Sequence, residues 1–312
     1  MERLSENKLI VVTRKTRLDE LVSRFNTVAQ ARFYIEHLGA DFSDYLREHE
    51  NYYQTLQLAS SKLSGLARVQ MLDRALLPNF IFGANDVVIA IGQDGLVANT
   101  LKYLSNQVLI GVNPDPARWD GVLLPFVVWQ LQSVVTDVFK GKRPIKEVTL
   151  AQVELNDGQR LVAVNDFFIG QKTHVSSRYT LHIDSLQERQ SSSGIIISTG
   201  LGSTGWLKSI IAGASRLMSQ MGETQVSDRS VGNIPWNADY LLYSVREPFP
   251  SRNSAASLVF GQVTQDKPLR ILSEMAENGV IFSDGIESDY LAFNSGIQAT
   301  IYPAEHKGRL VI

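Results

Sequence analysis

The stretch from residue 86 to residue 112 constrains the fold more than any other part of the sequence. Val87–Ile91 is an unbroken apolar run, which is typical of a parallel strand buried on both faces. The run stops at Gly92, and apolar residues then recur at helical spacing. A second apolar run follows at Val108–Val112. The pattern predicts a βαβ unit in a parallel sheet.

Asp94 lies between Gly92 and Gly95, at the carboxyl end of the first predicted strand. Ligands of open α/β sheets bind at this edge, beside a helix N-terminus whose amides favour anions. A carboxylate there should repel phosphate unless a metal ion or a substrate hydroxyl lies between them. The arrangement therefore points to phosphoryl transfer. The structural alternative is a helix N-cap, in which Asp94 accepts hydrogen bonds from main-chain amides.

Composition limits the class of protein. The 312 residues are enough for two domains, and the apolar and charged fractions (44% and 20%) are ordinary for a globular protein. The net charge of −2 argues against non-specific nucleic-acid binding, and the lack of cysteine excludes disulfides and thiolate sites. Residues 1–8 lack the apolar core of a secretion signal, and the apolar stretch 122–129 is too short to cross a bilayer. We therefore expect a cytoplasmic protein without nucleic-acid or membrane partners.

The chain changes character along its length. The apolar residues 9–12 predict a strand. The mainly helical region 17–66 is expected to cover the sheet, and no catalytic or binding motif is found in it. From about residue 146 the pattern turns to short alternating strands punctuated by turns. We predict an α/β nucleotide-binding domain with parallel strands (residues 1–125). A mostly antiparallel, β-rich, sandwich-like domain should follow it (residues 126–312).

The segment Gly200–Gly205 matches the G-x-G-x-x-G fingerprint and lies between an apolar strand and a helix. A Rossmann turn also requires a second strand that ends in an acid about twenty residues on. Residues 220–232 are polar instead, with Glu223 and Asp228 in no apolar run, and the neighbouring strands read as antiparallel. The Rossmann interpretation is therefore rejected. Hydroxyls and glycine amides at this helix start could still bind phosphate or ribose.

Two further features have a structural and a functional interpretation. Asn165 and Asp166 are adjacent at a strand end and could hold a ribose and an adenine edge by paired hydrogen bonds. The pattern alone favours a turn pair. Trp206 opens an apolar stripe of the predicted helix, and this spacing favours a core position over a base-stacking role.

Four motifs, in order along the chain, resemble those of the NAD kinase family. They are Gly92–Gly95, Asn165–Asp166, Thr199–Trp206 and Phe282–Gly285. The resemblance covers most of the chain from about residue 81 to residue 300 and is strongest toward the mitochondrial-type branch and its bacterial relatives. It implies a two-domain NAD kinase-like architecture. The implied reaction moves the terminal phosphoryl group of ATP to the 2′-hydroxyl of the adenosine ribose of NAD, with Mg²⁺.

The resemblance also assigns roles at the strand edge and in the β-rich domain. Asp94 would orient and deprotonate the 2′-hydroxyl or position the metal, and Gly92 and Gly95 would let phosphates approach the backbone. Asn165 and Asp166 would hold the adenosine half of the dinucleotide.

The glycine-rich segment is the next implied part of the site. Thr204, Gly205, Trp206 and Ser209 would line the NAD adenine and the nearby phosphate. Asp284, in the late Ser-Asp-Gly turn, would be structural or catalytic. Side chains that hold a metal by themselves are not predicted. Homodimers or larger homo-oligomers, formed through the β-rich domain, are also implied.

The motifs depart from the family pattern at several positions, among them Gly200, Leu201, Gly205 and Trp206 of the glycine-rich segment. Gln93 and Leu96 stand where the family has glycine and threonine, so Gln93 adds a side chain where the backbone should approach the triphosphate. Ser193 stands where many relatives have an aspartate that contacts the nicotinamide ribose. These departures keep an alternative open: a nucleotide-binding protein or a redirected sugar or lipid kinase of the same fold, with weak or lost NAD kinase activity.

Overall fold

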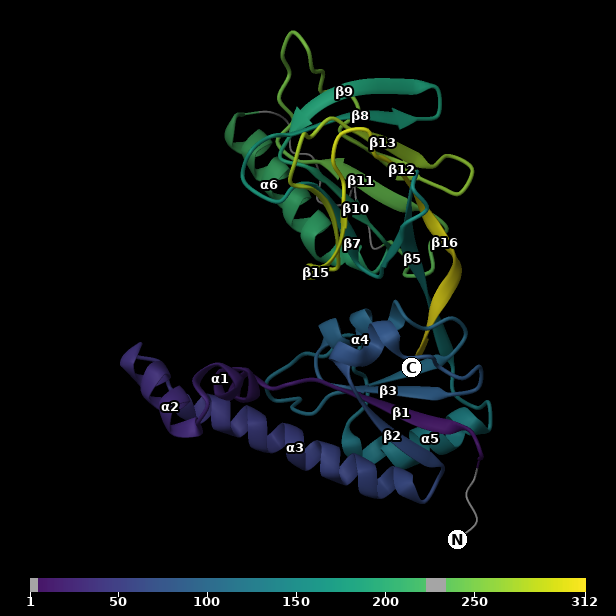
Figure 1. Ribbon diagram of the computed structural model, residues 1–312. Coiled ribbons are helices and arrows are strands. Elements are labelled where there is room, and N and C mark those ends of the chain that lie inside the picture. Colours follow the sequence, from purple (N-terminus) through teal and green to yellow (C-terminus); the bar gives the residue numbers. More distant parts are fainter. Residues whose placement is uncertain (1–4, 223–233) are drawn as a thin grey trace. The chain divides into compact units, whose positions relative to one another are not determined.

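The computed structural model describes residues 5–222 and 234–312, without the side chains of residues 287 and 288 (Figure 1). The chain divides into two compact units. Unit 1 contains residues 1–146 and 309–312, and unit 2 contains residues 147–308. Each unit is described by itself.

Unit 1 is built on a parallel sheet. Its strand order is β2-β1-β3-β4-β16, and each of these neighbours is paired in parallel. The strands are β1 (Lys8–Thr13), β2 (Arg68–Asp73), β3 (Val87–Ile91), β4 (Val108–Val112) and the end of β16 (Gln298–Val311). Every residue of β3 is buried, because helices cover both faces of the sheet. The predicted βαβ unit is confirmed.

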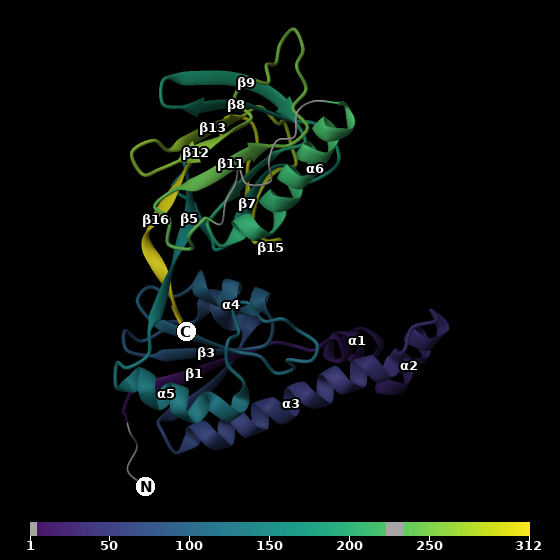
Figure 2. The same cartoon turned by 180° about the vertical axis from the view of Figure 1, so that it is seen from behind.

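Helices cover this sheet on both sides (Figures 1 and 2). The helices of unit 1 are α1 (Arg17–Phe25), α2 (Val28–His37), α3 (Phe42–Ser64), α4 (Asp94–Leu101) and α5 (Leu131–Phe139), with the short turns η1 (Arg74–Asn79) and η2 (Val128–Gln130). Of these, α1 and α2 pack with the start of α3 in a separate cluster. The helices α3 and α5 lie on one face, where Tyr52, Leu63 and Val134 pack in one core with the strands. The helix α4 packs on β3 and β4 from the other face. The prediction of a helical region at 17–66 is confirmed.

The division between the units differs from the boundary expected after residue 125. The helix α5 belongs to unit 1, because Val134 and Val135 are fully buried in the core that α3 forms with the sheet. The end of the chain also returns to unit 1, where Arg309 and Leu310 pair with β4. A boundary inside the chain is set by such packing, which the composition along the sequence does not reveal. The roles assigned to the two domains remain predictions.

Unit 2 is a sandwich of two sheets. One contains β16, β13 (Leu269–Ser273), β8 (Ser177–Ile183) and β9 (Leu186–Ser192), with β5 (Ile145–Leu155) and β6 (Arg160–Ala163) attached. The other sheet is antiparallel throughout. Its strands, in order, are β12 (Phe260–Val263), β11 (Leu241–Val245), β10 (Ile195–Ser198), β7 (Asp166–Gln171), β14 (Gly279–Ser283) and β15 (Ile286–Ala292). Phe167, Tyr179 and Ile195 belong to the core between the sheets. The predicted antiparallel, sandwich-like architecture is confirmed.

The glycine-rich segment follows β10 and leads through the turn η3 (Gly202–Thr204) into α6 (Trp206–Gln220). Because β10 is antiparallel to both β7 and β11, this segment is not part of a Rossmann βαβ unit, as predicted. Residues 223–232, whose polar character argued against a second Rossmann strand, lie outside the described residues. Within the described ranges, no helix is both long and apolar enough to span a bilayer.

Candidate functional site

Asp94 is the first residue of α4 and follows β3 at its carboxyl end. Its carboxylate accepts hydrogen bonds from two amides of the loop after β4: Leu123 N at 2.8 Å from Oδ1 and Val122 N at 3.2 Å from Oδ2. The N-cap of α4 is Gln93, which makes no side-chain capping bond. The N-cap interpretation of Asp94 is therefore wrong. A loop distant in sequence, and not its own helix, holds the half-buried side chain of Asp94 at the sheet edge.

The glycines beside Asp94 have different surroundings. A Cβ on buried Gly92 would lie 2.9 Å from Leu96 Cδ2 and 3.5 Å from Arg14 Nε, so the backbone packs closely against both side chains. A Cβ on Gly95 would meet no atom within 4 Å, so its backbone is open to solvent. Leu96 is buried, at 3% exposure, and takes part in packing rather than facing a ligand. Gln93 is half-buried at the start of the helix.

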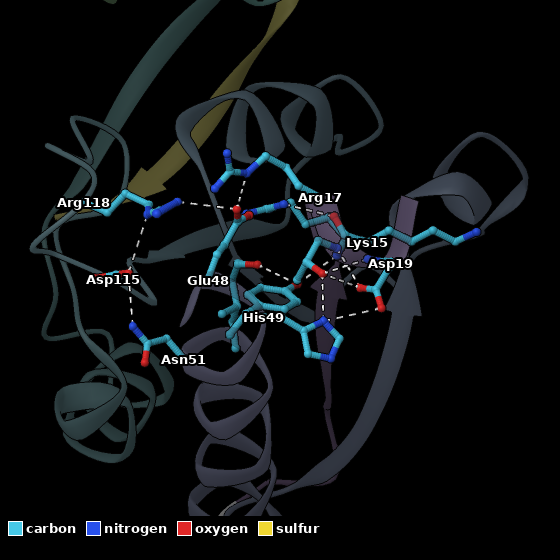
Figure 3. A network of polar contacts seen from close by, with 12 residues as sticks. Lys15, Arg17, Asp19, Glu48, His49, Asn51, Asp115 and Arg118 are labelled. Carbon is cyan, nitrogen blue, oxygen red and sulfur yellow. Dashed lines mark hydrogen bonds and ion pairs between the residues drawn. The ribbon is translucent and has the colours of Figure 1, made fainter. Parts of the chain in front are cut away.

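A charged network with Glu48 and Arg14 buried at its centre lies at the carboxyl ends of the strands of unit 1 (Figure 3). Glu48 of α3, at 4% exposure, accepts hydrogen bonds from Arg14 Nη2 at 2.9 Å and from Arg17 Nε. Arg118 Nη1 lies 3.5 Å from the same carboxylate, and both Arg17 and Arg118 also contact Asp44. Burial alone would raise the pKa of Glu48, but the hydrogen bonds and charges of Arg14 and Arg17 lower it.

Tyr52 adds a second link between α3 and the strand ends. Its hydroxyl accepts a hydrogen bond from Arg14 N at 2.8 Å and donates one to Ile91 O at 3.1 Å, which joins the end of β1 to the end of β3. Burial raises the pKa of this phenol to about 12. Tyr52 and Glu48 therefore fix the backbone immediately before Gly92. Sequence reasoning missed this role, because both residues lie in the helical region that was expected only to cover the sheet.

Among the described residues, Asp94 is not part of a cluster of three metal-binding side chains. Across residues 5–222 and 234–312, no three His, Asp or Glu side chains lie where they could together hold a metal ion. Mg²⁺ in nucleotide sites is commonly bound by one or two carboxylates together with substrate phosphates. The single carboxylate of Asp94 fits an ion that is held mainly by a triphosphate, and it does not fit a metal held by the protein alone.

A cavity of about 360 Å³ in unit 2 brings together residues from three of the predicted motifs. They belong to the bend before β7, the segment from Leu201 to the start of α6, and the turn between β14 and β15. The lining residues are Asn165, Asp166, Leu201, Gly202, Thr204, Gly205, Asp284 and Gly285. Segments separated by more than a hundred residues thus form one small site.

The bend before β7 is fastened to the glycine-rich segment. Thr199 donates from its hydroxyl to Val164 O at 2.6 Å and from its amide to Asn165 O at 2.9 Å. A Cβ on Gly202 would lie only 2.0 Å from Asn165 O, so this close approach requires glycine. Asn165 lies in the bend, and Asp166 is the first residue of β7. Asn165 and Asp166 therefore form a bend, as the pattern predicted, and they also line the cavity.

Trp206 and Ser209 lie beside this cavity and do not line it. The Trp206 side chain is 38% exposed, its ring stacks on Phe168 with 5.9 Å between centroids, and the Arg246 guanidinium lies 5.4 Å from the ring. The prediction that Trp206 is a core residue is wrong, because the buried residue of α6 is Leu207. The exposed Ser209 hydroxyl donates to Gly205 O at 3.4 Å within its own helix.

No protein-family model matches the chain, but parts of it are similar to curated proteins. A probable NADH kinase of Oryza sativa subsp. japonica is 24% identical over 224 residues, which are 64% of this chain and 63% of that protein. An NAD kinase of Lactobacillus acidophilus is 27% identical over 174 residues, 52% of this chain and 60% of that protein. The matches therefore span less than two thirds of the length of these curated relatives.

Solved structures extend the likeness to almost the whole chain. An NAD kinase from Archaeoglobus fulgidus in complex with ATP superposes with a TM-score of 0.58 at 15% identity, over 98% of this chain and 93% of the other. Yeast NADH kinase complexed with NADH gives 0.57 at 15% identity, over 98% and 84%. The chain thus has the fold of the NAD kinases, and its predicted resemblance to that family is confirmed without distinction between the branches.

Proposed function

We propose that this protein is an NAD kinase that transfers the terminal phosphoryl group of ATP to the 2′-hydroxyl of the adenosine ribose of NAD. The fold and the named relatives support the class of enzyme. The observation that carries the proposal is the cavity of unit 2, where Asn165, Asp166, Thr204 and Gly205 converge. These are the residues that the family motifs assign to the adenosine half of NAD.

In the proposed reaction the two units supply different parts. Asp94 of unit 1 accepts the proton of the attacking 2′-hydroxyl, since its carboxylate is held by loop amides at the carboxyl edge of the sheet. The open backbone at Gly95 and the start of α4 receive the phosphates of ATP. In unit 2, Asn165 and Asp166 bind the adenosine. Bound Mg²⁺ would neutralise charge on the phosphates.

A redirected kinase of the same fold is the second candidate, and Gln93 is the observation that favours it. This side chain stands at the N-cap of α4, where the family has glycine. The departure at Leu96 argues less for it, because Leu96 is buried, at 3% exposure, and takes part in packing. A sugar or lipid kinase would still use Asp94 but would not need the cavity beside Asn165.

The proposal also includes Mg²⁺ as cofactor, a cytoplasmic location and assembly into a homodimer or a larger homo-oligomer through the β-rich unit. ATP is the proposed donor, and both NAD and NADH are candidate acceptors, in line with the ligands named for the relatives. Comparing turnover with NAD and NADH would settle the acceptor. Light scattering of the purified protein would measure the oligomer.

The test is incubation of the pure protein with NAD, ATP and Mg²⁺, followed by chromatographic measurement of NADP. NADP formation is expected, and calorimetric titration should show that Asn165→Ala weakens NAD binding by roughly ten- to a hundredfold, the cost of one buried hydrogen-bond partner. Ser219→Ala is the matched control, because Ser219 is exposed near the end of α6 and does not line the cavity. Consumption of ATP with a sugar or lipid acceptor, and none with NAD, would favour the second candidate.

A further inference from the structure

The carboxylate of Asp284 binds the main chain of the bend that contains Asn165 and Asp166. Its Oδ1 accepts hydrogen bonds from Asn165 N at 2.7 Å, Val164 N at 3.1 Å and Asp166 N at 3.2 Å. Three consecutive amides therefore converge on one carboxylate. Such a cluster of main-chain donors binds an anion strongly and holds the backbone in a single conformation.

The turn that presents Asp284 is itself fixed to the same bend. The Asp284 amide donates to Asp166 O at 2.9 Å, and the Ser283 hydroxyl donates to Val162 O at 2.6 Å. Asp284 has φ +54° and Gly285 has φ +70°, so both residues adopt the left-handed conformation of a tight hairpin turn. The carboxylate consequently has little freedom to move away from the amides.

Asp166 and Asp284 line one cavity but have different environments. Three amides satisfy the carboxylate of Asp284, whereas the Asp166 side chain has no cation beside it among the described residues. Burial, and next the charge of Asp284, raise the pKa of Asp166 to about 7. The remaining residues of the wall, Leu201 to Gly205, contribute no titratable group. Asp166 therefore takes up a proton at a higher pH than an ordinary aspartate.

We propose that Asp284 is a positioning residue for the dinucleotide: it orients Asn165 and Asp166 through the main chain. This inference rests on the proposed function and identifies how that pocket is built. A neutral Asp166 donates a hydrogen bond to a ribose oxygen, which an ionised carboxylate cannot do. Asp284 itself acts through Asn165 and Asp166.

The test is Asp284→Asn, which keeps the shape of the side chain and removes its charge. We expect NAD binding to weaken by roughly ten- to a hundredfold, since a charged acceptor of three amides is lost. In turnover, the KM for NAD should rise while the KM for ATP stays near its wild-type value. An NMR titration of the Asp166 carboxyl should show its pKa lowered by the substitution.

Asp184→Asn is the matched control. Asp184 also has φ +54° at a hairpin turn of unit 2, but it forms only an exposed ion pair with Lys267. This variant should bind NAD like the wild type, and thermal unfolding of both variants checks that they fold. Unchanged NAD affinity and an unchanged Asp166 pKa in folded Asp284→Asn would overturn the inference. Wild-type protein that binds no NAD would instead refute the proposed function, and the positioning role with it.

Discussion

Arg14 and Glu48 form a buried ion pair, with 2.9 Å between Nη2 and Oε1 and only 9% and 4% of the two side chains exposed. Arg14 directly follows β1 and its Nε lies against Gly92, while Glu48 comes from the N-terminal third of α3. The pair therefore fixes the backbone that precedes Asp94. A carboxylate that must meet a substrate hydroxyl within hydrogen-bond distance requires such a rigid support.

Replacing Glu48 should strongly destabilise unit 1. Glu48→Ala leaves Arg14 buried without its partner, and breaking a buried pair in this way costs about 3–5 kcal/mol of the free energy of unfolding. Urea denaturation measures the loss. Glu50→Ala on the exposed side of the same helix is the control and should cost far less. Equal losses in the two variants would show that the network contributes nothing beyond a surface pair.

Asp94→Asn should remove the base and keep the fold. The amide oxygen can still accept the bond from Leu123 N, so the loop after β4 should stay in place. General-base contributions are about a hundred- to ten-thousand-fold in rate, so the kcat for NADP formation should fall by that order. The NAD dissociation constant should change much less. Near-wild-type turnover would contradict the role assigned to Asp94.

Gln93→Gly tests where the triphosphate binds. If the Gln93 side chain obstructs the approach of phosphate to the N-terminus of α4, the KM for ATP should fall and that for NAD should stay fixed. A higher KM for ATP would mean that the Gln93 amide binds a phosphate. No effect on either constant would show that the triphosphate lies elsewhere.

The pH dependence of stability should reveal Asp166. Its pKa of about 7 in the folded protein exceeds the ordinary aspartate value of 3.8. Between these two pH values the folded state therefore holds a proton that the unfolded state has released. The contribution of Asp166 to stability is therefore fully present below about pH 4 and is lost as the pH rises to 7. Asp166→Asn does not titrate. The difference in unfolding free energy between wild type and this variant should fall over that range, and a constant difference would contradict the raised pKa.

Local patterns in the sequence were sufficient for the parts of the fold that depend on periodicity. The apolar run Val87–Ile91 predicted a central strand, and each of its residues is buried. Helical spacing after residue 206 predicted α6, yet the buried residue is Leu207 and Trp206 is exposed. Periodicity shows that a helix is amphipathic, but packing decides which side chains are covered.

The site could be predicted only in part, because its contacts join distant segments. Asp94 was found from its place at a strand end, whereas its partners Val122 and Leu123 lie 28 and 29 residues further on. The bond between Asp284 and the Asn165 amide spans 119 residues. Arg14 could have been found by the argument that identified Asp94, since it also follows a parallel strand. Glu48 could not, because a glutamate among polar helix residues reads as solvent-exposed.

In the proposed reaction the terminal phosphoryl group of ATP is transferred to the 2′-hydroxyl of the adenosine ribose of NAD. The most direct measurement uses ATP labelled in its terminal phosphate, with NAD and Mg²⁺, and locates the label in the product. The account predicts label on the 2′-phosphate of NADP with wild-type protein, and a loss of about a hundredfold or more with Asp94→Asn. Label that appears only as inorganic phosphate, or on an acceptor other than NAD, would contradict it.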